Sequence, residues 1–242
     1  MNSKILNIGA LLVSKMITEE NKKPRFMYRE KPMDINDSGW RIFSGYETDD
    51  YTDDSQNIGV YSSKTLIGID PTIEEVLEKG IGSVYERLTD KSPWYKVTDF
   101  PLEDNYIVPV QLTKTWSFSI NNLFIKSIED GAMKYTTGDK TLRIVAWNSP
   151  QNKDELYIEY KNRMNNRDQT ISKTLKNFEI SDEHIYKLGY MITGKDGDRE
   201  YSELHSFSII DKSILYTVFY FDDSADSKWA ISTWESINAK QL

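Results

Sequence analysis

The sequence predicts an α+β protein of two domains: a small α+β domain at residues 1–98 and an α/β sandwich at residues 113–242. Three observations predict this organisation. The first hundred residues show short strand patterns and one clear helix start. Residues 98–110, TDFPLEDNYIVPV, hold two prolines and three acids and indicate a linker, which is placed at residues 99–112. The second half runs through a meander of strands to a terminal helix, as in a sandwich whose antiparallel sheet is covered by helices.

The N-terminal pattern is that of short strands around one well-marked helix. Asp70 is the expected N-cap of this helix and Pro71 occupies its first position. The side chains expected to be buried are Ile73, Val76 and Leu77. Alternating residues at 25–31 predict a half-buried strand that forms a hairpin with the strand before it. The strands are expected at residues 5–17, 25–31, 40–46, 57–61, 83–88 and 94–97.

The C-terminal pattern is dominated by three consecutive strands joined by short turns. The turns are Gly194-Lys195-Asp196-Gly197 and Asp211-Lys212, residue types that reverse the chain between antiparallel strands. Helices are expected at residues 153–168 and 224–239, the second with a buried face of Ala230, Trp234 and Ile237. The strands are expected at residues 113–120, 141–147, 185–193, 200–210 and 213–221.

The composition restricts the class of protein and its partners. Hydrophobic residues make up 38% of the chain and aromatic residues 12%, which is enough to build folded cores. The net charge of −8 argues against a nucleic-acid partner, which requires a surplus of lysine and arginine. The absence of cysteine excludes disulfides and thiolate chemistry, and it fits a reducing compartment. The apolar residues 5–13 are interpreted as a buried strand rather than a signal sequence, and no window approaches the ~18 apolar residues of a membrane span. We therefore expect a cytoplasmic protein without a membrane segment.

Residues 34–57 carry the most distinctive charge pattern in the chain. Within eight residues this segment holds five carboxylates and no basic residue: Glu47, Asp49, Asp50, Asp53 and Asp54. Because like charges repel one another, such a cluster is either a solvated loop or a surface that binds a cationic partner. A Ca²⁺ site is a third interpretation, but the spacing lacks the alternate ligands, central glycine and final glutamate of an EF-hand. We therefore expect no metal site and no cofactor.

Two aromatic residues accompany the acidic cluster. Trp40 lies in the expected strand 40–46 and is interpreted as a core residue, with support of a binding surface as the alternative. Tyr51 is surrounded by acids and is expected to be exposed. The predicted partner-binding residues are Trp40, Glu47, Asp49, Asp50, Tyr51, Asp53 and Asp54.

No catalytic group emerges from the sequence. His184 and His205 are the only histidines, and they lie in or beside different expected strands. Neither has an acidic residue at ligand spacing or a nucleophile beside it, so neither a catalytic triad nor a zinc site is expected. The segment Gly194–Gly197 lacks the glycine spacing and the following helix of a phosphate-binding loop. The sequence therefore predicts a protein that is not an enzyme.

Several ordered motifs in the first domain are shared with one protein family. They are LVSKMI at residues 12–17, FMYRE at 26–30, DSGWRIFSG at 37–45, NIGVY at 57–61 and IGSVYER at 81–87. Over residues 8–97 the chain resembles the DUF2185 family, which is related to the Imm33 group of bacterial immunity proteins. The resemblance implies a small α+β domain that binds and blocks a toxin, and it brings no catalytic residues. The second half is more weakly similar to the Mog1/PsbP/DcrB-type α/β sandwich, as an analogy of fold.

These observations predict a non-catalytic protein that binds another protein. The partner implied is a cognate bacterial toxin, which the chain would neutralise as an immunity protein through the acidic loop. The alternative is a small-molecule or peptide binding module in the C-terminal sandwich, with a regulatory N-terminal domain. A deep pocket lined by aromatic side chains and a few polar groups would favour that alternative.

Overall fold

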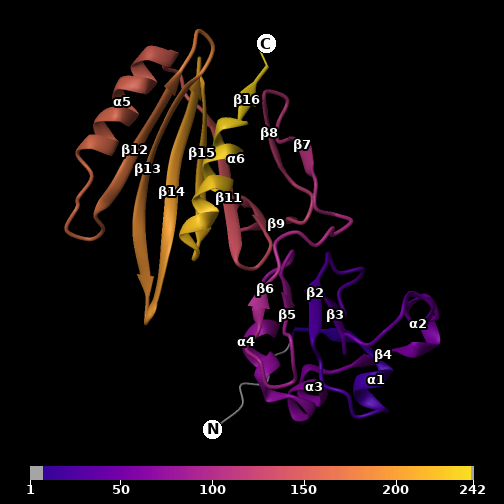
Figure 1. The fold of residues 1–242 in the computed structure, drawn as a ribbon. Helices are drawn as coiled ribbons and strands as arrows, with labels where there is room; N and C mark the ends of the chain where they lie inside the picture. The colour runs from indigo at the N-terminus through magenta and orange to yellow at the C-terminus, as the bar shows by residue number, and fades with distance from the viewer. Residues whose placement is uncertain (1–7, 241–242) are drawn as a thin grey trace. The chain divides into compact units, whose positions relative to one another are not determined.

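The protein divides into two compact units between Tyr106 and Ile107. This computed structural model describes residues 8–240, and each unit is described by itself below (Figure 1). The antiparallel sheets, the short helices and the C-terminal helix confirm the α+β class. The predicted domain limits remain a prediction, although part of the expected linker 99–112 is regular structure because Ile107–Gln111 forms strand β7.

A six-stranded mixed sheet forms the centre of the N-terminal unit. The strand order is β4-β1-β3-β2-β5-β6, with β1 parallel to β3 and the other neighbours antiparallel. The strands are β1 Ala10–Ser14, β2 Phe26–Arg29, β3 Asp37–Phe43, β4 Ile58–Tyr61, β5 Val84–Glu86 and β6 Tyr95–Lys96. The exposed edge strand β4 is the element that follows the acidic segment in the chain.

Short helices cover one face of this sheet and complete its core. Leu66, Ile73 and Leu77 pack from the helical side against residues such as Val13 and Ile42 of the strands. Asp70 caps the segment as predicted, because its Oδ1 accepts hydrogen bonds from the Thr72 N–H and hydroxyl. The helices are α1 Lys15–Thr18, α2 Asp49–Asp53, η1 Ser55–Asn57, α3 Ser63–Ile69, η2 Pro71–Ile73 and α4 Glu74–Leu77.

Two expectations for the first strands are wrong. The strand predicted at 5–17 is limited to β1, because Ser14 Oγ accepts a hydrogen bond from the Met16 N–H and begins helix α1. Residues 5–7 of that prediction lie outside the described residues. The strand predicted at 25–31 is observed as β2, but it does not form a hairpin with β1. It pairs with β3 and β5, and β3 lies between β1 and β2. Periodicity predicts a strand but not its partner, because pairing depends on residues far apart in the chain.

An ion-pair network fixes the start of β3. The Arg41 guanidinium is 5% exposed and donates to Asp37 Oδ2 at 2.8 Å and to Glu30 Oε1 at 2.6 Å. The Asp37 carboxylate also accepts from the Met33 and Gly39 N–H groups. Burial raises the pKa of the Asp37 carboxyl, but these donors outweigh it and lower the pKa to about 2.

The stability of the N-terminal unit is therefore expected to fall at acid pH partly through Asp37. A carboxyl with a folded pKa of about 2 and an unfolded value of 3.8 stabilises the fold fully above pH 3.8. This contribution of about 2 kcal/mol is lost as the pH falls through about 2. In urea unfolding between roughly pH 6 and pH 2, the difference between wild type and Asp37→Asn should stay constant down to about pH 4 and shrink below it, because the two pKa values are 3.8 and about 2. A difference independent of pH would contradict the assignment.

The C-terminal unit is built on a seven-stranded antiparallel sheet. Its order is β12-β13-β14-β15-β11-β10-β9, and a separate three-stranded sheet has the order β16-β8-β7. The strands of the large sheet are β9 Ile125–Glu129, β10 Ala132–Thr136, β11 Lys140–Asn148, β12 Thr174–Ser181, β13 Tyr186–Asp196, β14 Arg199–Ile210 and β15 Ser213–Phe221. The small sheet contains β7 Ile107–Gln111, β8 Trp116–Asn121 and β16 Asn238–Ala239.

Two helices cover opposite faces of the large sheet. Helix α5, Lys153–Asn165, packs Leu156 and Tyr160 against a cluster that contains Ile214. Helix α6, Ser227–Glu235, packs Trp234 in a second cluster that contains Leu215. Because neighbouring residues of a strand point to opposite faces, Ile214 and Leu215 place the two helices on opposite sides (Figure 1). This arrangement is the predicted α/β sandwich.

The structure corrects several boundaries in this unit. The strands expected around 185–193 and 200–210 extend further than expected, so the turn is Gly197-Asp198 alone, with Gly197 at a positive φ of 60°. The last helix ends at Glu235, and β16 pairs with β8 where the helix was expected to continue. Ile237 is buried as predicted, but it lies beyond the helix.

Candidate functional site

The acidic segment forms a short helix rather than an irregular loop. Helix α2 begins after Thr48, whose side chain accepts a hydrogen bond from the Tyr51 N–H. Asp49 and Asp50 occupy its first turn, where carboxylates interact favourably with the helix dipole. Asp54 ends α2 and caps the following turn η1 by accepting from the Gln56 N–H at 2.9 Å. The local sequence therefore orders the segment without neutralising its charge.

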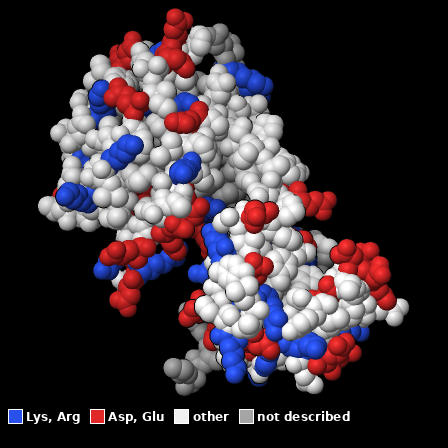
Figure 2. Space-filling model, viewed as in Figure 1, with Lys and Arg blue, Asp and Glu red and all other residues white. Residues whose placement is uncertain are grey.

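Four carboxylates of this segment lie on the surface without a cationic partner in the described part of the chain. We call Asp49, Asp50, Asp53 and Asp54 the acidic surface; all four are exposed. Across residues 8–240 none of them forms an ion pair with a lysine, arginine or histidine. Figure 2 shows acidic side chains gathered over α2 in the N-terminal unit. The acidic cluster expected from the sequence is thus exposed and, within residues 8–240, not neutralised by ion pairs in the folded protein.

Glu47 has a different role from the four aspartates. Its carboxylate turns back and accepts from the N–H groups of Ser44, Gly45 and Tyr46, and from the Ser44 hydroxyl. Burial raises the pKa of the Glu47 carboxyl, but hydrogen bonds from the Ser14 hydroxyl and the Ser44 N–H lower it overall. Glu47 therefore holds the turn that precedes α2, and its carboxylate is already engaged.

The two predicted aromatic residues are less exposed than the four aspartates. Trp40 is fully buried in the core, and its Nε1 donates to the Leu77 carbonyl at 3.2 Å. This agrees with the core interpretation and leaves Trp40 no surface for direct contact. Tyr51 is half-buried rather than exposed, and its carbonyl accepts from Asn57 Nδ2 at 3.0 Å. Tyr51 is therefore less exposed than predicted.

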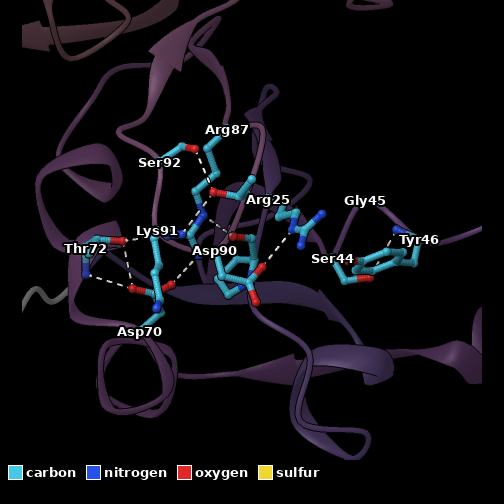
Figure 3. Close-up of polar contacts among 12 residues, drawn as sticks. Arg25, Ser44, Gly45, Tyr46, Asp70, Thr72, Arg87, Asp90, Lys91 and Ser92 are labelled. Atoms are coloured by element: carbon cyan, nitrogen blue, oxygen red, sulfur yellow. Dashed lines mark hydrogen bonds and ion pairs between the residues drawn. The ribbon is translucent and has the colours of Figure 1, made fainter.

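The sequence prediction missed a group of cations around Tyr46, just before α2. Tyr46 is 49% exposed, with Arg25 Cζ 4.7 Å and Lys22 Nζ 5.1 Å from the centroid of its ring. Arg25 Nε also donates to Asp90 Oδ1 at 2.7 Å (Figure 3). The only sequence signal for this group was Tyr46 itself, an aromatic residue directly before an acidic run. That signal does not identify the cations, because they come from another loop.

A buried ion pair links the helical layer to β5 and does not belong to the surface. Arg87 donates to Asp70 Oδ2, to the Pro24 carbonyl at 2.7 Å and to Thr72 Oγ1 at 3.2 Å (Figure 3). The side chains of Arg87 and Asp70 are 1% and 7% exposed. The Trp94 ring covers the guanidinium, with its centroid 4.7 Å from Arg87 Cζ. Because these groups are enclosed and paired, their role is to hold the fold.

The expectation that His205 has no acidic neighbour is wrong. Its Nε2 lies 2.5 Å from Glu203 Oε2, and its Nδ1 lies 2.7 Å from the Tyr216 hydroxyl. Residues two apart in a strand share a face, so Glu203 and His205 could have been paired once both were assigned to one strand. Both ring nitrogens are engaged, which leaves neither free for a substrate or metal. No group of three or more His, Asp or Glu side chains in residues 8–240 is placed to hold a metal ion.

Cavities in the C-terminal unit are lined mainly by charged and polar groups. One of about 280 Å³ lies beside Tyr201, Tyr220 and the Arg199–Asp222 ion pair. Others of about 350 and 450 Å³ lie beside Lys153 and Glu203, respectively. These are not the deep aromatic pocket that would favour small-molecule binding. Among the described residues, no helix combines the length and apolar character needed to cross a membrane.

Comparison with known families identifies the unit that carries the acidic surface. Residues 11–98 match the Immunity protein Imm33 domain. The predicted resemblance is thereby confirmed over almost the same residues. The match runs from β1 to just beyond β6 and includes the whole of α2, so the acidic surface lies within the Imm33 domain. This match supports an immunity-type function. No match was found among curated proteins.

Two solved structures are similar to parts of the chain. One, from Bacteroides thetaiotaomicron VPI-5482, has a TM-score of 0.41 and 11% identity, and the alignment covers 52% of this chain and 45% of that protein. The other is cyanobacterial PsbP (CyanoP) from Synechocystis sp. PCC 6803, also with a TM-score of 0.41 and 11% identity, covering 60% and 98%. The second agrees with the predicted likeness to PsbP. At these scores the similarity carries no argument about function.

Proposed function

We propose that the protein is an immunity protein that neutralises a bacterial toxin by binding it through the acidic surface. The match of residues 11–98 to the Imm33 domain supports the class of partner. The observation that carries the contact is the set of four exposed aspartates, none of which has an ion-pair partner within residues 8–240. Binding a cationic surface would relieve their mutual repulsion and accelerate encounter.

In this proposal the predicted site residues divide between contact and support. Asp49, Asp50, Asp53 and Asp54 present carboxylates to solvent and are the proposed contacts. Tyr51 contributes the exposed part of its ring. Glu47 orders the preceding turn, and Trp40 is buried in the core, where it donates to the Leu77 carbonyl, so both act indirectly. A toxin surface of lysine and arginine side chains is the complementary partner.

Neutralising the acidic surface is expected to weaken toxin binding through the association rate. In the variant Asp49→Asn, Asp50→Asn, Asp53→Asn and Asp54→Asn, steering of a cationic partner is lost, so the association rate at low salt should fall about tenfold or more. Binding kinetics would be measured by surface plasmon resonance at several salt concentrations, with an inactivated form of the toxin encoded by the neighbouring gene. The wild type should lose rate as salt rises, whereas the variant should respond little.

A matched variant separates local contact from net charge. The same unit contains four other exposed acids, which are Glu19, Glu20, Glu75 and Glu78. Their replacement by glutamine changes the net charge by the same amount, from −8 to −4 because four acids are neutralised. The glutamine variant should bind as the wild type does. Equal rates and equal salt dependence for the two variants would remove the acidic surface from the proposal.

A further inference from the structure

We propose that the free edge of β4 receives an extended segment of the toxin, which joins the sheet as an additional strand. This inference rests on the proposed function and specifies how the same partner is held. Among residues 8–240, β4 is the terminal strand of the six-stranded sheet and pairs on one side only, with β1. An edge strand presents unpaired backbone donors and acceptors, and an extended peptide satisfies them most directly.

The edge of β4 is continuous with the acidic surface. Asp53 and Asp54 are separated from β4 only by the short turn η1, Ser55–Asn57. A segment aligned along β4 would therefore have one end near these carboxylates, where basic side chains fit best. The four residues of β4 span about 10 Å in extended conformation, so the contacts at the two ends of the strand would be about three or four residues apart in the segment.

A groove of mixed lining lies toward the other end of β4. It has a volume of about 1140 Å³, and it combines apolar side chains such as Ile35 and Val60 with polar and charged ones such as Arg29, Ser63 and Lys64. Ile35 and Val60 are 97% and 69% exposed. Isolated exposed apolar residues are common, but two that line one groove at the end of an edge strand indicate a docking position for an apolar side chain.

The exposure of Ile35 is built into the fold. Asp34 Oδ1 accepts from the Asn36 and Asp37 N–H groups and closes the turn that presents Ile35. The Asn36 carbonyl accepts from the Ala10 N–H at 2.6 Å, which ties this turn to β1. The loop therefore holds Ile35 outward through several hydrogen bonds.

The orientation of β4 also leaves open the face to which Val60 points. Tyr61 packs its ring over Gly59, where a Cβ atom would lie 2.5 Å from the ring, and its hydroxyl accepts from Thr18. Gly59 and Tyr61 therefore share the closed face, and Val60 points to the opposite one. The expected segment is extended, carries lysine or arginine at one end and has a large apolar residue three or four positions away.

The experiment combines variants of the full chain with hydrogen exchange. The probe is the purified, inactivated cognate toxin. The variants Ile35→Glu and Val60→Glu should each weaken its affinity about tenfold or more, because a charge would enter the contact made by the apolar side chain. Leu88→Glu is the matched control, since Leu88 is 75% exposed in the same unit, and it should leave the affinity unchanged. Amides of residues 58–61 should exchange more slowly in the complex because they gain hydrogen bonds.

The outcomes separate this inference from the proposed function. If the asparagine variant of the acidic surface weakens binding while Ile35→Glu and Val60→Glu do not, strand addition is wrong and the proposed function stands. Unchanged exchange at residues 58–61 in the complex would also overturn strand addition. If the toxin does not bind the wild-type chain, the proposed function fails and this inference with it. Self-association detected by sedimentation and abolished by Val60→Glu would assign the edge to a second copy and overturn the toxin as its occupant.

Discussion

Replacing Arg87 with methionine is expected to lower the free energy of unfolding of the N-terminal unit by about 3–5 kcal/mol. The Arg87 guanidinium is enclosed and donates to Asp70, Thr72 and the Pro24 carbonyl. Burial raises the pKa of the Asp70 carboxyl, but hydrogen bonds from Thr72 and Arg87 lower it overall. Without Arg87 the carboxylate would lose its counterion while remaining desolvated, and the Pro24 carbonyl would lose its donor.

Urea unfolding followed by hydrogen exchange of peptides from residues 8–98 would measure this loss separately from the C-terminal unit. Arg25→Met is the matched control, because Arg25 pairs with Asp90 at the surface, where the side chains are 23% and 48% exposed. An ion pair of that kind contributes about 1 kcal/mol or less. The double variant Asp70→Asn with Arg87→Met should recover part of the stability, since no buried charge remains. A loss for Arg87→Met no larger than that for Arg25→Met would contradict the buried-pair interpretation.

Replacing Trp40 with alanine is expected to destabilise the N-terminal unit by about 3–5 kcal/mol without removing a binding contact. Trp40 is fully buried, so alanine would leave a large cavity between β3 and the helical layer. It would also leave the Leu77 carbonyl without the donor Nε1. Trp40→Phe should cost less, because the ring volume is partly kept.

The Trp40→Phe variant also tests whether Trp40 belongs to the partner surface. Under conditions where Trp40→Phe remains folded, its affinity for the toxin should equal that of the wild type. The matched control is Tyr46→Ala, since Tyr46 is 49% exposed and its loss should change stability by about 1 kcal/mol or less. A folded Trp40→Phe protein that binds about tenfold more weakly would return Trp40 to the binding surface.

Short-range features of the fold could be predicted because they depend on adjacent residues. Asp70 caps its helical segment by accepting from the Thr72 N–H, two residues away. The strand expected at 213–221 is observed as Ser213–Phe221, directly after the turn at Asp211-Lys212. In contrast, β9 was not predicted, because all of its residues are exposed and an edge strand of this kind shows no alternation.

The candidate site was predicted by charge and then divided by the fold. Composition alone placed Glu47 with the four aspartates, because all five are carboxylates in one short segment. Glu47 instead accepts hydrogen bonds from the backbone of the turn before α2, whereas Asp49 and Asp50 begin a helix and face solvent. The turn conformation that directs Glu47 inward is not encoded by residue type alone.

The sequence by itself determined the α+β class, the position of the acidic cluster and the resemblance of the first domain to immunity proteins, because all three can be read from local order and composition. Only the tertiary structure decided that β1 pairs with β3, that Tyr216 contacts His205 and that, among residues 8–240, β4 is left as a free edge beside the acidic surface. These features depend on which segments meet in space. That choice depends on burial and hydrogen bonding summed over the whole unit, and no local pattern records it.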